Sequence, residues 1–272
     1  MKTGWLKRPD CSIYYEVCGS GPAMVFAHGL GGNHLSWWQQ IAHFGAKYTC
    51  VTFAHRGFAP SSAVDGAKAP ECFADDLAAL VAELNLKEFR LVAQSMGGWT
   101  SIEYLLRDAS KVKGLVLAST SGTLDFRQLK GPEAAEIKEW IARAPKVMAD
   151  LEARDILVAG GERFARDQPA LAMLYRQIGQ LTGSDLKAAD FKAAVRPKIM
   201  QMRVKDPALL ARLPMPVLFL GGDEDCLFPA AACPGFAALA PKGRSVRVPK
   251  AGHSVYFERA AEFNRIVEDF LK

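Results

Sequence analysis

The segment from residue 89 to residue 106 joins an apolar run, a serine and an amphipathic stretch without any loop between them. The apolar run 89–93 is typical of a buried strand, and the residues after 98 place apolar side chains at helical spacing. Ser95 lies between the two, with Ala93 and Gly97 two positions to either side. Small neighbours are needed where a strand nearly touches the helix that follows it. The segment therefore predicts a strand, a sharp turn with Ser95 at its apex, and a helix.

The composition argues against two classes of partner, nucleic acids and membranes. The 272 residues carry a net charge of +5 and 23% charged residues, with lysine and arginine scattered along the chain. This distribution does not indicate a nucleic-acid partner. No stretch approaches the roughly 18 apolar residues of a membrane span, so no membrane partner is expected.

The N-terminus and the cysteines bear on localisation. Residues 1–5 contain no apolar signal core, which argues against secretion. The six cysteines are dispersed and form no C-x-x-C pair. In a chain of this length they are expected to be free thiols of a reducing compartment, and we expect a cytoplasmic protein.

Strand-like and helix-like segments alternate through both ends of the chain, which predicts right-handed βαβ units and a mostly parallel sheet. The expected strands are 12–17, 23–27, 49–53, 89–93, 114–118, 216–220 and 246–248, with helices at 37–44, 72–84, after Ser95 and at the C-terminus. Between 121 and 205 the alternation stops, and helices are expected around 133–143, 145–158, 161–181 and 185–203. We therefore expect an α/β core of residues 1–120 and 206–272, interrupted by a helical cap of residues 121–205.

Three further motifs follow expected strands. His28-Gly29-Leu30 comes after the strand 23–27, and its glycines allow backbone amides to approach a ligand. An acidic trio, Asp223-Glu224-Asp225, follows the strand 216–220 and precedes Pro229. Gly252-His253-Ser254 follows the strand 246–248. Since the carboxyl ends of parallel strands meet at one edge of a sheet, these motifs and Ser95 are expected to lie together.

With these motifs in this order, the chain resembles the α/β-hydrolase family, in its serine esterase or enol-lactonase branch, over nearly its whole length. The resemblance implies an α/β-hydrolase fold with an inserted helical cap. Three positions depart from the family's pattern: Ala93 replaces the first glycine of the elbow, and Ala54 and Ala59 replace an Asp and a Gly of the loop 54–61.

The resemblance also implies roles for individual residues. Ser95, Asp225 and His253 would be the nucleophile, the acid and the base, and the spacing to Pro229 selects Asp225 from its trio. The amides of Leu30 and Met96 would bind the oxyanion of an acyl-enzyme reaction.

The sequence indicates a substrate pocket only weakly, and it does not indicate a metal or cofactor site. Trp37 and Gln94 are candidates for the substrate pocket, since they lie beside these motifs. No pair of histidines has the i, i+4 spacing of a metal-binding helix, so neither a metal nor another cofactor is expected.

The function expected from the resemblance is hydrolysis of a small carboxylic ester or lactone through an acyl-enzyme, with a small-molecule acyl substrate as partner. Two alternatives stay open: a C–C bond hydrolase of ring-cleavage products, and a hydrolase-derived receptor for a small molecule. Members of the C–C group often have Asn before the nucleophile and Trp after the base, where this chain has Gln94 and Ser254. The sequence does not indicate the substrate or the oligomeric state.

Overall fold

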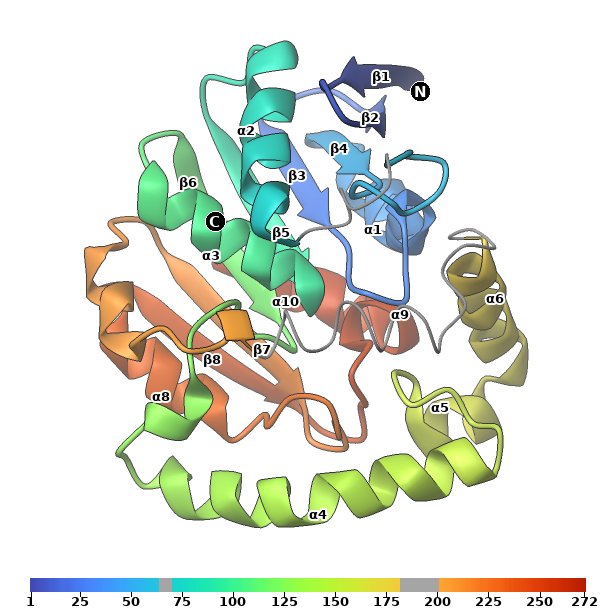
Figure 1. Ribbon diagram of the computed structural model, residues 1–272, viewed down its shortest axis with the longest axis vertical. Coiled ribbons are helices and arrows are strands. Elements are labelled where there is room, and N and C mark those ends of the chain that lie inside the picture. Colours follow the sequence, from blue (N-terminus) through green and yellow to red (C-terminus); the bar gives the residue numbers. More distant parts are fainter. Residues whose placement is uncertain (64–69, 182–200) are drawn as a thin grey trace.

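A computed structural model describes residues 1–63, 70–181 and 201–272 of the chain. Its centre is a sheet of eight strands in the order β1-β2-β4-β3-β5-β6-β7-β8 (Figure 1). β1 pairs with β2 and β2 with β4 in antiparallel register, and every other neighbouring pair is parallel. The expected mostly parallel sheet is therefore confirmed. The strands are β1 Lys2–Lys7, β2 Ser12–Cys18, β3 Ala23–Ala27, β4 Thr49–Phe53, β5 Phe89–Gln94, β6 Val112–Ala118, β7 Val217–Gly222 and β8 Gly243–Val248.

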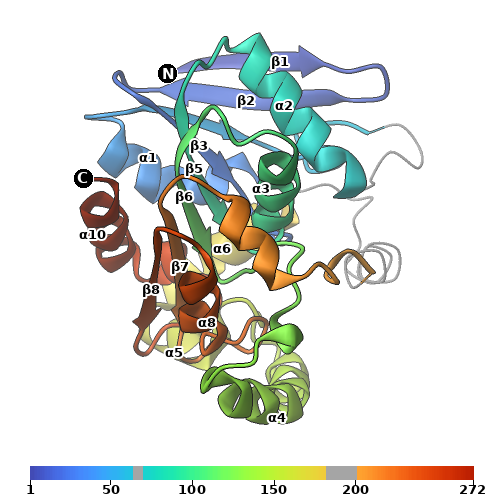
Figure 2. The ribbon, with the colours of Figure 1, turned by 90° about the vertical axis from the view of Figure 1, so that its left-hand side faces the viewer.

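Helices cover both faces of the sheet, so successive residues of its central strands are buried on opposite sides (Figure 2). In β5, Leu91 packs on the side of α2, α3 and α8, whereas Val92 packs on the side of α1 and α10. Burial on both faces explains why the central strands read as continuous apolar runs. The helices are α1 Trp38–Phe44, α2 Phe73–Glu83, α3 Met96–Arg107, α4 Glu133–Ala153, α5 Gly161–Asp167, α6 Pro169–Gln180, α8 Ala232–Leu239, α9 Val255–Glu258 and α10 Ala260–Leu271. Short 3-10 helices lie at His34–Trp37, Pro70–Cys72, Phe126–Gln128 and Pro207–Arg212.

The edge strand β1 has no counterpart among the expected elements. Only Leu6 of its six residues is buried, and the strand begins and ends with lysine. Its existence depends on pairing with β2 along all six of its residues, which is information that a local apolar pattern does not contain.

Between β6 and β7 the chain forms α4, α5 and α6, but their boundaries differ from the expected ones. The two helices expected at 133–143 and 145–158 are one helix, α4, which continues through Pro145. A proline removes one hydrogen bond to the carbonyl four residues earlier. That residue is Ile141, which is 42% exposed, so it lies on the solvent side of the helix while Ile137, Ala144 and Leu151 stay buried along the other side.

The helix expected at 161–181 is likewise two helices, because α5 ends at Asp167 and α6 begins at Pro169. Proline suits the first position of a helix and cannot continue one that precedes it without strain. Most of the helix expected at 185–203 lies outside the described residues. The division into core and cap stays a prediction.

Two further observations concern the state of the cysteines and the possibility of a membrane-spanning helix. All six cysteines are free. Within residues 1–63, 70–181 and 201–272, no helix is long and apolar enough to cross a membrane.

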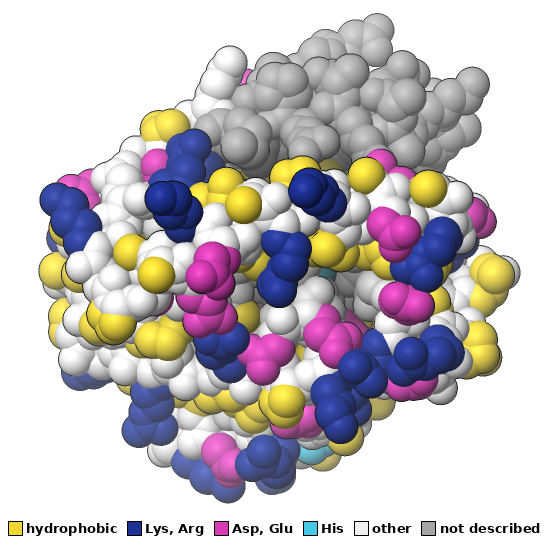
Figure 3. Space-filling view, turned by 90° about the horizontal axis from the view of Figure 1, so that it is seen from below, with side chains coloured by type: hydrophobic (Ala, Val, Ile, Leu, Met, Phe, Trp, Pro, Cys, Tyr) yellow, Lys and Arg dark blue, Asp and Glu magenta, His cyan; other side chains and the backbone are white. Residues whose placement is uncertain are grey.

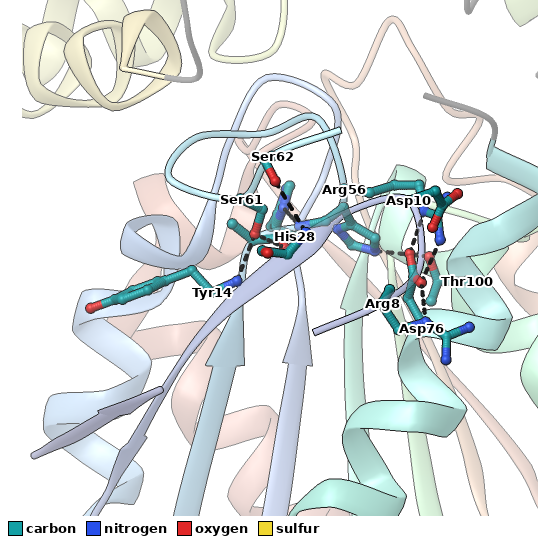
Figure 4. Close-up of polar contacts among 12 residues, drawn as sticks. Arg8, Asp10, Tyr14, His28, Arg56, Ser61, Ser62, Asp76 and Thr100 are labelled. Atoms are coloured by element: carbon teal, nitrogen blue, oxygen red, sulfur yellow. Dashed lines mark hydrogen bonds and ion pairs between the residues drawn. The ribbon is translucent and has the colours of Figure 1, made fainter. Parts of the chain in front are cut away.

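A buried ion-pair cluster holds the loop after β4 against α2 (Figure 4). Arg56 donates to both carboxylate oxygens of Asp76, at 2.6 and 2.7 Å, and to Asp10 at 2.6 Å. Arg8 donates to Asp76 at 3.2 Å. The side chains of Arg56 and Asp76 are each only 2% exposed, so neither can be satisfied by water if its partner is removed.

We expect Asp76→Asn to lower the free energy of unfolding by about 3–5 kcal/mol, because it leaves the Arg56 cation buried without its main partner. The adjacent Asp75 is the matched control, since it pairs with Arg107 on the surface. Asp75→Asn should cost about 0–1 kcal/mol. Urea denaturation of both variants measures the difference, and equal losses would contradict this account of the cluster.

Candidate active site

Ser95 occupies the sharp turn between β5 and α3, with φ of 50° and ψ of −115°. This backbone conformation is strained for a residue that has a side chain, and such strain persists only where the surrounding structure enforces it. Gly97 supplies that enforcement. A Cβ at Gly97 would come within 2.1 Å of the Ala27 carbonyl oxygen, so only glycine allows α3 to approach β3 this closely. The turn therefore has the geometry that the sequence predicted.

Backbone amides of two segments lie around Ser95. A Cβ at Gly29 would come within 3.1 Å of the Ser95 Cβ, so the loop after β3 runs directly beside the serine. Met96 opens α3, where the first N–H groups of a helix lack partners within it. Among the described residues, neither the Leu30 nor the Met96 amide donates a hydrogen bond. Both amides are thus available to an acceptor.

His28 fixes the loop that carries Leu30. Its Nδ1–H donates to the Gly29 carbonyl at 2.7 Å, and its Nε2 accepts from the His55 amide at 2.9 Å. An acceptor Nε2 sets the tautomer of the ring. Burial lowers the pKa of His28 to about 3, so the ring is neutral and links the loops after β3 and β4.

Each member of the acidic trio has a different partner. The Asp223 carboxylate accepts from Arg247 at 2.8 Å, and Glu224 pairs with Arg163 at 2.7 Å on the surface. The Asp225 Oδ1 accepts from the amides of Leu227 and Phe228, and its Oδ2 lies 2.8 Å from His253 Nδ1. Asp225 is therefore the member that faces the histidine.

His253 follows β8 and is 5% exposed. Gln94, the residue before Ser95, donates to the His253 carbonyl at 3.2 Å and so links the backbone of the two loops. Ser95 makes no hydrogen bond to His253 in the described structure. Such bonds are often long in ligand-free enzymes and shorten when substrate binds.

The two candidate pocket residues have their own structural contacts. The Trp37 ring is fully buried, with centroids 4.4 Å from Tyr256 and 5.2 Å from Phe26. Gln94 is 1% exposed and holds His253 as described. Their assignment to a substrate pocket stays a prediction.

Glu258 holds the backbone of Gly252, the residue before His253. Its Oε1 accepts from the Gly252 amide at 2.9 Å, and the side chain is 5% exposed. Burial raises the pKa of Glu258 from 4.5 to about 8, against the lowering effect of the Gly252 hydrogen bond and with a further increase from Asp225. The group is therefore a neutral acid at pH 7.

Other contacts to these loops come from α4 and α6, and no sequence motif marks them. Trp140 on α4 donates its indole N–H to the Asp225 carbonyl at 2.7 Å. On α6, the Tyr175 hydroxyl accepts from Ser254, the neighbour of His253, at 2.8 Å. Both pairs are far apart in the chain, so only the folded structure identifies them.

A cavity of about 420 Å³ lies between α4 and the acid's loop, lined by Trp140, Arg143, Asp223 and Asp225 among others. Figure 3 shows the molecule from the side of α4, where acidic and basic side chains are mixed. Ser95 is not among the described residues that line this cavity. In the described part of the chain, no three His, Cys, Asp or Glu side chains are grouped so as to hold a metal.

The sequence pattern of the alpha/beta hydrolase fold family matches residues 22–260, and the chain belongs to this family. It is 27% identical over 263 residues to a putative non-heme bromoperoxidase of Mycobacterium tuberculosis, covering 96% of this chain and 97% of that protein. It is 25% identical over 280 residues to 3-oxoadipate enol-lactonase 2 of Acinetobacter baylyi, covering 98% and 96%. Its fold resembles that of a thermophilic esterase from Thermogutta terrifontis, with a TM-score of 0.78, 23% identity and coverage of 100% and 98%.

Glu258 gives the protein a specific pH dependence. Between about pH 5 and pH 8 an unfolded glutamate has lost its proton, whereas the folded Glu258 keeps it, so stability falls as pH rises through this interval. Glu258→Gln keeps an acceptor for Gly252 and has no proton to lose. Wild type loses stability over this interval and Glu258→Gln does not. We therefore expect the free energy of unfolding of Glu258→Gln, measured relative to that of wild type, to rise by about 1–3 kcal/mol between about pH 5 and pH 8.

Thermal unfolding at several pH values measures this difference. Glu262→Gln, a partly exposed position on the neighbouring α10, is the control and should follow the wild-type curve. A wild-type protein whose stability tracks that of Glu258→Gln at every pH would contradict a protonated Glu258.

Proposed function

We propose that this protein is a serine hydrolase that cleaves a small carboxylic ester or lactone through an acyl-enzyme. The observation that carries the proposal is the Asp225–His253 hydrogen bond at 2.8 Å, formed at the same edge of the sheet as the strained turn of Ser95. The relative named as an enol-lactonase, which this chain matches over nearly its full length, supports the reaction class.

In the proposed mechanism His253 accepts the proton of Ser95 as the serine oxygen attacks the acyl carbonyl. Asp225 holds the imidazole with Nδ1–H directed at itself, so Nε2 is the basic nitrogen, and it stabilises the imidazolium that forms. The amides of Leu30 and Met96 bind the oxyanion of the tetrahedral intermediate. Each such donor is worth about 3–4 kcal/mol in the transition state. Water then attacks the acyl-enzyme, with His253 as the base.

The helices between β6 and β7 are proposed to act as a cap. Trp140 and Tyr175 attach α4 and α6 to the loops of Asp225 and His253, and Asn33, in the loop after β3, donates to the Ile178 carbonyl of α6 at 3.2 Å. In this role the helices exclude water from the acyl group and shape its pocket.

We expect Ser95→Ala and Asp225→Asn each to reduce the hydrolysis of 4-nitrophenyl acetate and butyrate by roughly 10⁴-fold, because the first removes the nucleophile and the second inverts the histidine tautomer. Steady-state kinetics on purified, folded variants measures the loss. Asp223→Asn is the matched control, since its carboxylate pairs with Arg247, and it should retain most of the activity.

Two outcomes would overturn the proposal. Ser95→Ala protein with more than about a tenth of the wild-type rate would exclude this serine as the nucleophile. A wild-type protein that releases a single equivalent of nitrophenol without turnover would instead be a receptor built on the hydrolase fold.

A further inference from the structure

Arg203 contacts a residue of the helix that begins directly after the proposed nucleophile. Its guanidinium carbon is 5.9 Å from the centroid of the Trp99 ring and 5.8 Å from that of Phe126. Trp99 is four residues after Ser95 on α3, a rise of about 6 Å along the helix, and it packs against Met96. Phe126 packs on Phe228, in the loop of Asp225. Arg203 therefore lies between the start of α3 and the acid's loop.

Among the described residues, the charge of Arg203 has no ion-pair partner. Its Nε is buried and bonds to no group in the described structure, where the guanidinium forms no salt bridge either. The two carboxylates that act on it electrostatically are both engaged elsewhere. Asp125 accepts from Arg127 at 2.7 and 3.0 Å, and Asp225 accepts from His253 and two amides.

A second unsatisfied donor lies in the same contact. The indole Nε1 of Trp99, the ring on which Arg203 stacks, is also buried and has no acceptor among residues 1–63, 70–181 and 201–272. Buried polar groups are nearly always hydrogen-bonded, so two orphaned donors at one place indicate a missing acceptor. Burial, together with the nearby charge of Arg127, lowers the pKa of Arg203, yet a guanidinium stays charged at neutral pH.

We propose that Arg203 binds a carboxylate carried by the substrate at a distance from the scissile carbonyl. One unpaired cation calls for one negative charge, and the planar guanidinium matches a carboxylate with two parallel hydrogen bonds. A doubly charged phosphate would place excess negative charge beside Asp125 and Asp225. The inference rests on the proposed function and narrows its substrates to esters or lactones that bear a carboxylate.

The test compares pairs of substrates that differ in charge. On the acyl side, 4-nitrophenyl hemiglutarate is paired with 4-nitrophenyl 5-methylhexanoate, in which an isopropyl group replaces the carboxylate. On the leaving-group side, 4-carboxyphenyl acetate is paired with 4-acetylphenyl acetate. Wild type should prefer the anionic member of one pair in kcat/KM, and Arg203→Met should lower that ratio about tenfold to a hundredfold.

Lys205→Met is the matched control. It removes one positive charge two residues along the same segment, where Lys205 pairs with Glu103 and contacts neither ring, so the ratio should keep its wild-type value. An equal loss in both variants would show a general effect of net charge and overturn a specific role of Arg203. No preference for the anionic member of either pair in wild type would also overturn it.

A binding measurement separates this inference from the proposed function. The N-methyl monoamide of glutaric acid carries the carboxylate but no ester, and calorimetry should show at least about tenfold weaker binding to Arg203→Met than to wild type. Equal binding to the two proteins contradicts the inference. Failure of Ser95→Ala to lose ester hydrolysis contradicts the proposed function alone, since this binding does not need the serine.

Discussion

The close approach of α3 to β3 is the constraint on which the rest of the site depends. Because Gly97 lies against the Ala27 carbonyl, the chain must reverse direction within the single residue Ser95, and this residue takes the positive φ. The turn exposes the serine at the edge of the sheet and directs the first amides of α3 towards the same point. Packing on both faces of β5 supplies the stability that offsets the strain, which typically costs about 1–3 kcal/mol.

A second level of organisation connects the loops at this edge with one another and with the helices over them. Gln94 joins the serine's loop to that of His253, and His28 joins the loops after β3 and β4. Trp140 and Tyr175 then attach α4 and α6 to the loops of the acid and the base. These two hydrogen bonds support the backbone on which the Asp225–His253 pair is placed.

The sequence predicted those features that local patterns encode. The buried strands are continuous apolar runs, and the turn of Ser95 needs small neighbours, so both were recognisable from their own residues. The choice of Asp225 over Asp223 followed from spacing, and the structure places Asp225 beside His253. The prediction of separate helices around 133–143 and 145–158 was wrong, because burial along one side of α4 outweighs the hydrogen bond lost at Pro145.

Features that depend on distant partners were beyond the sequence. β1 forms only through its pairing with β2, and the Tyr175–Ser254 contact joins residues 79 positions apart. Arg203 has no sequence motif; its place between two rings and its lack of an ion-pair partner among the described residues are seen only in the folded structure.

The proposed mechanism requires a covalent intermediate at this strained turn. Mass spectrometry of protein quenched in acid during turnover of 4-nitrophenyl butyrate, followed by peptide mapping, detects such an intermediate. We predict a butyryl group on Ser95 alone, in an amount that decays when substrate is exhausted. A butyryl group on another residue, or none at any time during steady turnover, would contradict it.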